Sequence, residues 1–251
     1  MSRKVLITGA TGLIGEMLAS ALADEYDLVL HGRDPERSEL QLADLENYDE
    51  MEQLMDGVDT VVHLAGAAAP DSSWDAVLSA NIIGFRNAIE AARAKGVKRF
   101  IFASTNHVMG FYDRDEQWPV YPHQLPRPDS LYGVSKAFGE TLGRFYHEKH
   151  GIDFIALRIG WNGEHPDAID TDLGRAMWLS NDDAVRAVRC AIEADVQFGL
   201  YYVVSDNPNR RWDLTNTMLE LGYRPQDSYE DFTDAEENTG EPVPGNYPAG
   251  M

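Results

Sequence analysis

The sequence TGATGLIG, at residues 8–15, decides the fold. It follows KVLIT (residues 4–8), a short apolar run with β-branched side chains that predicts a buried strand, and it precedes a helical pattern over residues 16–23. Glycines spaced G-x-x-G-x-x-G let the backbone turn tightly and approach an anion, while the following helix N-terminus offers free N–H groups to it. Strand, turn and helix together predict a cradle for the pyrophosphate of a dinucleotide. The residues expected to form this cradle are Gly9, Thr11, Gly12, Leu13, Ile14 and Gly15.

Outward from this turn, strand patterns alternate with helical patterns as far as residue 160. Such alternation is typical of parallel βαβ units, so the predicted fold class is α/β, a doubly wound parallel sheet of the Rossmann type. We expect residues 1–165 to form the dinucleotide-binding core and residues 166–251 a small C-terminal substrate-binding cap, with 180–204 completing the sheet. The expected strands are 27–31, 58–65, 97–103, 152–159 and 198–204; the expected helices are 45–56, 71–95, 130–150, 180–194 and 211–221.

The composition excludes several classes of protein. The chain has 251 residues with 42 acidic and 21 basic side chains, a formal charge of −21, so neither nucleic acid nor an anionic membrane is an expected partner. Cys190 is the only cysteine, which rules out a disulfide framework and a cysteine-based zinc site, and no metal is expected. Without a signal peptide or a long apolar run, the chain is expected to be cytoplasmic. Only five lysines are present, which favours a protein of a high-salt cytoplasm over an ordinary acidic one.

The end of the second expected strand bears on the choice of cofactor. An acid there binds the ribose 2′-hydroxyl of NAD, whereas a nearby arginine suits the 2′-phosphate of NADP. The sequence is HGRD (residues 31–34), which places Gly32 where the acid is usual and Arg33 beside it. NADP is therefore weakly preferred, and the alternative is NAD with Asp34 on the ribose.

A tyrosine and a lysine stand one helical turn apart in YGVSK (residues 132–136). Tyrosine is a poor base at neutral pH because its ordinary pKa is about 10, but a neighbouring ammonium favours the phenolate. Tyr132 with Lys136 can thus accept a proton from an alcohol, and hydroxyls at Ser104 and Thr105, after the fourth strand, can bind the same oxygen. Alternatively, Tyr132 and Lys136 are an exposed pair on a helix surface, and Ser104 and Thr105 cap a turn.

These motifs resemble those of the short-chain dehydrogenase/reductase superfamily, in its extended branch. The resemblance rests on TGATGLIG, LADL (42–45), HLAG (63–66), ASTNH (103–107), YGVSK and LRIG (157–160). It implies a catalytic triad of Thr105, Tyr132 and Lys136. It also implies that Asp44 and Leu45 contact adenine, that Leu64, Ala65 and Gly66 line the nucleotide, that Asn81 supports the lysine, and that Ile159 flanks the nicotinamide.

Three longer segments, FASTNHVMGFY (102–112), LYGVSKAFGE (131–140) and RAMWLSNDD (175–183), resemble the uronate dehydrogenases and related haloarchaeal aldose and glucose-6-phosphate dehydrogenases. This resemblance implies oxidation of a monosaccharide at C1 to a lactone, with hydride transfer to NAD(P) and with Asn106 and His107 on sugar hydroxyls. The resemblance also implies that uronate enzymes bind the substrate carboxylate with an arginine, and Arg175 is the candidate for this role. Its spacing from the tryptophan is offset, and Leu173 occupies the position of the family's arginine. The alternative is that Arg175 is a surface cation with no contact to substrate.

Several alternatives remain open on the sequence alone. The substrate could be an aldose, a uronate or a sugar phosphate. A sugar-nucleotide epimerase or dehydratase is the alternative enzyme, and a non-catalytic NADP-binding sensor is the alternative of another class. The superfamily resemblance also implies a homodimer formed through helices 71–95 and 130–150.

Overall fold

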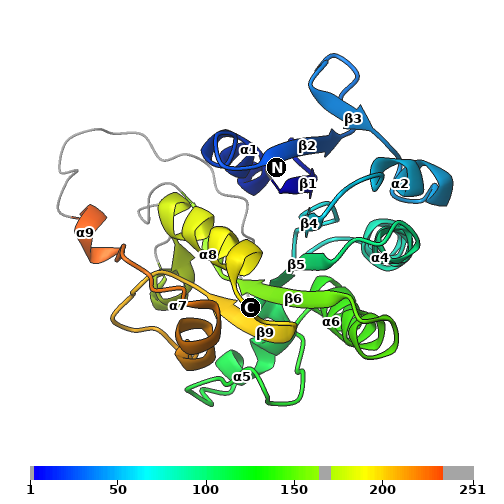
Figure 1. Ribbon diagram of the computed structural model, residues 1–251. Helices are drawn as coiled ribbons and strands as arrows, with labels where there is room; N and C mark the ends of the chain where they lie inside the picture. The colour runs from blue at the N-terminus through cyan, green and yellow to red at the C-terminus, as the bar shows by residue number, and fades with distance from the viewer. Residues whose placement is uncertain (1–2, 164–170, 234–251) are drawn as a thin grey trace.

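The structure is a computed structural model that describes residues 3–163 and 171–233. Its centre is one sheet of seven parallel strands in the order β3-β2-β1-β4-β5-β6-β9 (Figure 1). This is the doubly wound parallel sheet that the sequence predicts. Its strands are β1 (Lys4–Thr8), β2 (Asp27–Gly32), β3 (Leu40–Leu42), β4 (Thr60–His63), β5 (Arg99–Thr105), β6 (Asp153–Ile159) and β9 (Phe198–Val203), and a separate parallel pair joins β7 (Trp161–Asn162) to β8 (Trp178–Leu179).

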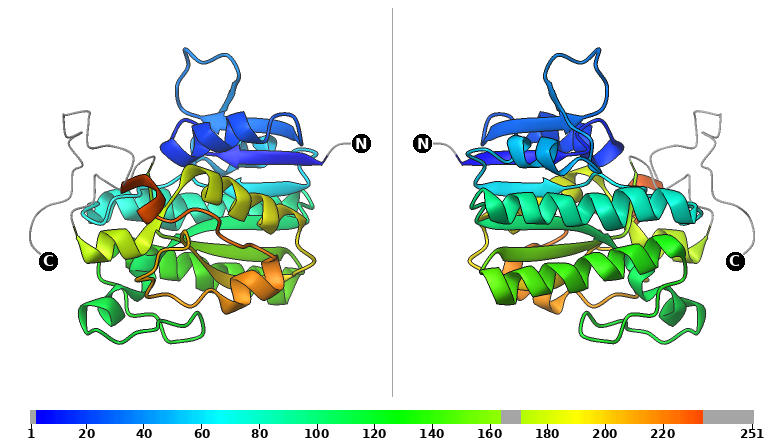
Figure 2. Two further views of the ribbon diagram at one scale, coloured as in Figure 1. Left: turned by 90° about the vertical axis from the view of Figure 1, so that its left-hand side faces the viewer. Right: turned by 90° about the vertical axis from the view of Figure 1, so that its right-hand side faces the viewer.

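Helices cover both faces of the sheet. Figure 2 shows α1 and α8 on one face and α4 and α6 on the other. The α-helices are α1 (Leu13–Ala21), α2 (Tyr48–Leu54), α3 (Trp74–Ala76), α4 (Phe85–Ala94), α5 (Gly110–Arg114), α6 (Leu131–His150), α7 (Asp172–Met177), α8 (Asn181–Glu193) and α9 (Glu230–Thr233). Two π-helices, η1 (Val77–Gly84) and η4 (Thr217–Leu221), and a 3₁₀ helix, η2 (Asn106–Met109), complete the set.

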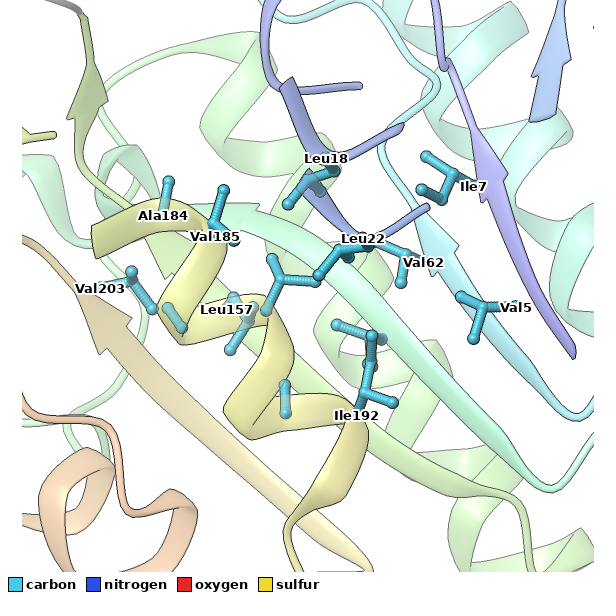
Figure 3. Packing of buried hydrophobic residues seen from close by; sticks show 14 of the residues in the cluster. Val5, Ile7, Leu18, Leu22, Val62, Leu157, Ala184, Val185, Ile192 and Val203 are labelled. Carbon is cyan, nitrogen blue, oxygen red and sulfur yellow. The ribbon is translucent and has the colours of Figure 1, made fainter. Parts of the chain in front are cut away.

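Apolar side chains from helices and strands form the core on the first face. Leu18 of α1 and Leu22, the residue that follows this helix, pack in one cluster with Val185 and Ile192 of α8 (Figure 3). Each such side chain contributes about 1.5–3 kcal/mol when it is fully buried. The strand residues beneath them include Val5, Ile7, Val62, Leu157 and Val203.

On the second face, glycines bring α6 against the sheet. A Cβ on Gly139 would overlap the ring of Phe102, and one on Gly143 would overlap the ring of Phe154. The absence of a side chain at both positions lets the backbone of α6 lie directly on these rings. This close packing fixes the height of α6, and hence of Tyr132 at its first turn, over the end of β5.

Two expected elements differ from the structure. The helix expected over 211–221 is helical only from residue 215, because residues 211–213 are extended and pair with Val120, whose N–H donates to the Arg211 carbonyl at 2.8 Å. The single helix expected over 71–95 begins at Trp74 and passes through the π-helix η1. The tail from residue 234 lies outside the described residues, whereas Glu230–Thr233 forms α9.

One arginine fastens the α8–β9 connection to the middle of the sheet. Arg99 of β5 makes an ion pair with Asp153 of β6 at 3.3 Å. The same guanidinium donates hydrogen bonds of 2.7–3.1 Å to four carbonyl oxygens that follow one another along the end of α8 and the turn after it. These belong to Ala191, Ile192, Ala194 and Val196. The turn therefore delivers β9 to its place beside β6.

Candidate active site

A cavity of about 690 Å³ lies at the carboxyl ends of the strands. The loops after β1, β2, β4, β5 and β6 line it, across the point where the strand order reverses between β1 and β4. Open α/β sheets bind ligands at this switch point, and the volume is in the range of small-molecule and cofactor sites. The predicted residues that line it are Gly9, Thr11, Gly12, Leu13, Ile14, Gly15, Arg33, Asp44, Leu45, Leu64, Ala65, Gly66, Thr105, Asn106, His107, Tyr132, Lys136 and Ile159.

The backbone of the glycine turn packs so closely that Gly9 and Gly15 cannot carry side chains. Gly9 has φ +72°, and a Cβ on it would lie 2.8 Å from the backbone nitrogen of Ala65. A Cβ on Gly15 would overlap the carbonyl oxygen of Gly9. Gly12 caps α1 and has no side chain to accept a hydrogen bond from the first turn. The first N–H groups of the helix can therefore donate to a ligand. These features fit the diphosphate of a dinucleotide.

The end of β2 brings no acidic side chain to the cavity, because Gly32 stands there. A Cβ on Gly32 would lie 2.9 Å from a methyl carbon of Leu40 and 3.0 Å from that of Thr11. Arg33 is exposed and lines the cavity, and no ion pair involves it within residues 3–163 and 171–233. The carboxylate of Asp34 accepts the N–H of Glu36 at 3.0 Å, so it caps its own turn.

A buried histidine beside the cradle escaped the sequence analysis. The Nδ1 of His31 accepts the N–H of Gly9 at 3.4 Å, which leaves Nε2 as the donor to the Ala43 carbonyl at 3.0 Å. Burial lowers the pKa of His31, which favours this neutral form. His31 thereby joins the glycine turn to the segment before Asp44. No pattern in the sequence separates it from an ordinary strand-end histidine.

Tyr132 and Lys136 lie together at the start of α6. Ser130 caps this helix by accepting the N–H of Gly133 at 3.1 Å. The Lys136 Nζ lies 5.7 Å from the centre of the Tyr132 ring and donates to the Ala103 carbonyl of β5 at 2.8 Å. Both side chains are buried, with 8% and 4% of their surface exposed. Burial lowers the pKa of Lys136 to about 8.

Asn81 supports this pair from outside the cavity lining. Its Oδ1 accepts the N–H of Ala67 at 2.8 Å and its Nδ2 donates to the Ala67 carbonyl at 2.9 Å. The same Nδ2 donates to Ser135 Oγ at 2.9 Å, and that hydroxyl donates to the Tyr132 carbonyl at 2.7 Å. Asn81 thus ties the loop after β4 to the turn of α6 that carries Tyr132 and Lys136.

The end of β5 brings three predicted side chains to the cavity. Thr105 Oγ1 accepts the N–H of His107 at 3.2 Å and donates to Asn106 Oδ1 at 3.3 Å. The Nδ1 of His107 lies 2.9 and 3.0 Å from the two carboxylate oxygens of Asp129. The His107 ring stands edge-on to Tyr132, with 6.0 Å between ring centres. Asp129 was not among the residues predicted for the site.

Arg175 lies apart from these residues. It belongs to α7 and is exposed, and its guanidinium carbon lies 6.0 Å from the centre of the Tyr229 ring. It is not part of the cavity lining, so its contact with a substrate carboxylate stays a prediction. The neighbouring cavity residues Trp161, Asn162 and Met177 were missed, because they come from the short pair β7–β8 and the end of α7.

A buried ion pair supports the floor of the site. Arg158 of β6 donates from Nε and Nη2 to the two carboxylate oxygens of Glu140 on α6, both at 2.8 Å. Ser104, which lines the cavity, donates to the same carboxylate at 2.6 Å. Although burial opposes the charged form, the hydrogen bonds to Glu140 keep the pKa of Arg158 above its ordinary value. The pair therefore joins β6 to α6 and, through Ser104, to the end of β5 at the cavity.

None of the helices formed by residues 3–163 and 171–233 is both long enough and apolar enough to span a membrane. The same residues contain no group of three or more histidine, cysteine or acidic side chains arranged to hold a metal ion.

Comparison with known proteins places the chain among nucleotide-dependent enzymes. Residues 5–167 match the model of the NAD dependent epimerase/dehydratase family. NAD-dependent glucose-6-phosphate dehydrogenase of Haloferax volcanii is 39% identical over 93% of this chain and 97% of its own. L-arabinose 1-dehydrogenase (NAD(P)(+)) of the same organism is 38% identical, over 90% and 97%. A mutant of uronate dehydrogenase from Agrobacterium tumefaciens, complexed with NAD, superposes with a TM-score of 0.83 at 31% identity, over 97% of this chain and 92% of that one.

Proposed function

Because the chain belongs to the NAD dependent epimerase/dehydratase family, we propose that it oxidises a monosaccharide, an aldose or a uronate, at C1 to the lactone with NAD(P). The observation that carries the proposal is the placement of Tyr132 and Lys136 in the same cavity as the glycine cradle. Relatives that oxidise sugars support it. The test is a steady-state screen of aldoses, uronates and sugar phosphates with both cofactors in molar salt, in which reduced cofactor and lactone must form together.

The protein's own groups handle the proton of this reaction. Oxidation removes a proton from the C1 hydroxyl oxygen and a hydride from C1 itself, and a nicotinamide, when bound, would accept the hydride. Tyr132 takes the proton on its phenolic oxygen, and the Lys136 ammonium stabilises the phenolate that precedes this transfer. The hydroxyl of Thr105 turns from Asn106 and donates to the C1 oxygen, which it thereby orients toward Tyr132. Lys136 also binds the nicotinamide ribose in this proposal.

The residues after β2 favour NADP as the cofactor. An acid at the position of Gly32 would bind the 2′-hydroxyl of NAD, and glycine supplies no carboxylate there. Arg33 brings a guanidinium to the same end of the cavity, where it can bind the 2′-phosphate of NADP in a bidentate, charge-assisted way. Of the two relatives from Haloferax volcanii, one is named for NAD and the other for NAD(P).

Replacing Arg33 with alanine tests the cofactor proposal. We expect kcat/KM for NADP to fall about 10–100-fold, because a hydrogen bond to a charged group contributes about 1.5–3 kcal/mol, while kcat/KM for NAD changes little. Arg37→Ala is the matched control, since Arg37 pairs with Glu16 and Glu39 instead of lining the cavity. The proposal is wrong if the wild-type protein has the higher kcat/KM with NAD and Arg33→Ala leaves the ratio of the two kcat/KM values unchanged.

We also propose that two copies of the chain associate through α6. Its exposed apolar residues Leu131, Val134, Phe138 and Phe145 recur at helical spacing along one face, and the neighbouring η1 adds Ile83. Exposed apolar side chains on one face of a helix are typical of an interface between proteins. The helices concerned are those through which the superfamily resemblance implies a dimer.

Phe138→Glu is expected to convert a dimer into a monomer, because it places a charge in the middle of the proposed interface. Light scattering after size exclusion, in low and in molar salt, measures the mass. Leu219→Glu is the control, since Leu219 is more exposed than Phe138 but lies on η4. A monomeric wild-type protein at micromolar concentration would refute the proposal.

A further inference from the structure

We propose that Arg211 is a positioning residue for sugar binding, because it ties the short helices α5 and α7 together behind one end of the cavity. That end, which we call the sugar end, is lined by Asn106, His107 and Met177. Arg211 belongs to the segment after β9 and is not among the described residues that line the cavity. The inference rests on the proposed sugar oxidation and adds a residue on which sugar binding depends.

The guanidinium of Arg211 binds two carboxylates that belong to different helices. Its Nη1 donates to Asp113 Oδ1 of α5 at 2.5 Å, and its Nη2 donates at 2.5 Å to Oδ2 of Asp172, the first residue of α7. Because the guanidinium is a planar fork, one arginine can hold two carboxylates in fixed directions, which the compact ammonium of lysine cannot do. Arg211 therefore sets the separation of α5 and α7 at this point.

Arg211 is itself held on several sides. Its guanidinium carbon lies 4.2 Å from the centre of the Trp118 ring, and the indole N–H of Trp118 donates to the same Asp113 oxygen at 2.9 Å. Its backbone carbonyl accepts the N–H of Val120 at 2.8 Å. The side chains of Arg211 and Asp113 are only 11% and 15% exposed, so salt screens the attraction between them much less than it screens an exposed pair.

The helix α7 carries this restraint from Asp172 to the cavity. It begins at Asp172 and ends at Met177, whose sulfur accepts a hydrogen bond from Asn106 Nδ2 at 3.4 Å. The Met177 carbonyl lies so close to Gly160 that a Cβ on this glycine would overlap it. Because α7 cannot move closer to the sheet here, its release from Arg211 would widen the sugar end.

The helix α5 carries the restraint to the opposite wall. It directly follows η2, which begins with Asn106 and His107 of the cavity lining. Figure 2 shows α5 (green) and α7 (yellow-green) at the same end of the sheet. Arg211 thus joins the two elements that carry the walls of the sugar end.

Other elements hold the reacting groups and the cofactor cradle. Tyr132 and Lys136 lie on α6, and Thr105 ends β5, which is paired on both sides by β4 and β6. The glycine cradle follows β1, on the far side of β4. Loss of Arg211 should therefore weaken sugar binding and leave cofactor affinity and the chemical step nearly unchanged. A residue with only a general structural role would instead affect cofactor and sugar alike.

Arg211→Met is expected to raise KM for the best sugar about tenfold, equivalent to about 1.4 kcal/mol, with a smaller change in kcat and an unchanged Kd for the cofactor. Steady-state kinetics and cofactor titration measure the three constants. Arg210→Met is the matched control, because Arg210 is the neighbouring residue and pairs with the exposed Asp206 instead. An unchanged KM, or a KM that rises only together with the cofactor Kd, overturns the inference.

Asp172→Asn tests the same link without removing a buried group. The Asp172 side chain is 72% exposed, so the variant should fold normally, and its amide oxygen can still accept from Asn209, which donates to Asp172 Oδ1 at 2.6 Å. We expect KM to rise about two- to fivefold, the effect of losing an exposed ion pair. Added to Arg211→Met, the substitution should raise KM no further, because both remove the same link. Two effects that multiply fully would show independent actions and overturn the inference.

Calorimetric titration separates this inference from the proposed reaction. If the wild-type protein oxidises no aldose or uronate, the proposed reaction fails, and the affinity of the same sugars for cofactor-loaded Tyr132→Phe, with and without Arg211→Met, decides the inference. Weaker binding by the double variant supports the role of Arg211. Equal binding by both proteins, or binding by neither, overturns it.

Discussion

Tyr132→Phe is expected to bind the dinucleotide as well as the wild-type protein does and to oxidise sugar about 10²–10⁴-fold more slowly, the usual contribution of a positioned acid or base. The phenolic oxygen is the proposed proton acceptor, and phenylalanine removes only that oxygen. The helix should be unaffected, because Ser130 still caps it and Asn81 still reaches it through Ser135. The ring of Tyr132 also keeps its edge-on contact with His107.

Single-turnover absorbance at 340 nm measures the chemical step, and cofactor titration measures binding. Tyr146→Phe is a matched control on the same helix, because its hydroxyl donates to Glu90 at 2.7 Å and lies outside the cavity lining. Lys136→Met should show a loss comparable to that of Tyr132→Phe if the ammonium acts through the phenolate. Wild-type rates in Tyr132→Phe would remove the proposed mechanism.

Arg158→Met is expected to lower the free energy of unfolding by about 3–5 kcal/mol, because removing one partner of a buried ion pair leaves the other charge uncompensated. The variant leaves the buried carboxylate of Glu140 without its counter-charge, with the hydroxyl of Ser104 as a weak replacement. The double variant Arg158→Met, Glu140→Met removes both charges and should recover most of the loss, since well-packed apolar replacements of buried ion pairs are often neutral.

Urea unfolding at fixed salt measures these free energies without changing the ionic strength. Arg144→Met provides the comparison, because its pair with Glu148 lies on the exposed side of the same helix and such pairs contribute about 0.3–0.5 kcal/mol. The prediction fails if the free energy of unfolding of Arg158→Met lies within about 1 kcal/mol of the wild-type value, because that is roughly what an exposed ion pair contributes.

The parts of the site that can be predicted from the sequence are those whose residues lie close together along the chain. The cradle at 8–15 and the pair in YGVSK need only a turn and one helical repeat, so spacing alone places them, and the resemblance adds the residues after β4 and β5. The long apolar strands are found for the same reason. By contrast, β3 (Leu40–Leu42) has only three residues, two of them exposed, and carries no alternation to detect.

The residues that the sequence does not reveal act across long separations. Asp129 reaches His107 from 22 residues away, and Arg158 meets Glu140 only because α6 returns over the sheet. The amide of Asn162 donates to Leu179 of β8 and to Asn181 of α8, neither of which is near it in the sequence. The expected helix at 211–221 is shortened by its pairing with Val120, a contact that no local pattern encodes. In each case the partner is fixed by tertiary structure.

During synthesis on the ribosome, β6 emerges well before β9, so the nascent chain carries an exposed strand edge until its last quarter has left the exit tunnel. Arg99 is likewise made long before the carbonyl groups that it binds at the end of α8. The seventh strand is therefore added only when translation has passed residue 203, and a premature stop before residue 198 would leave the long strand β6 as the edge of the sheet, open to pairing with another chain.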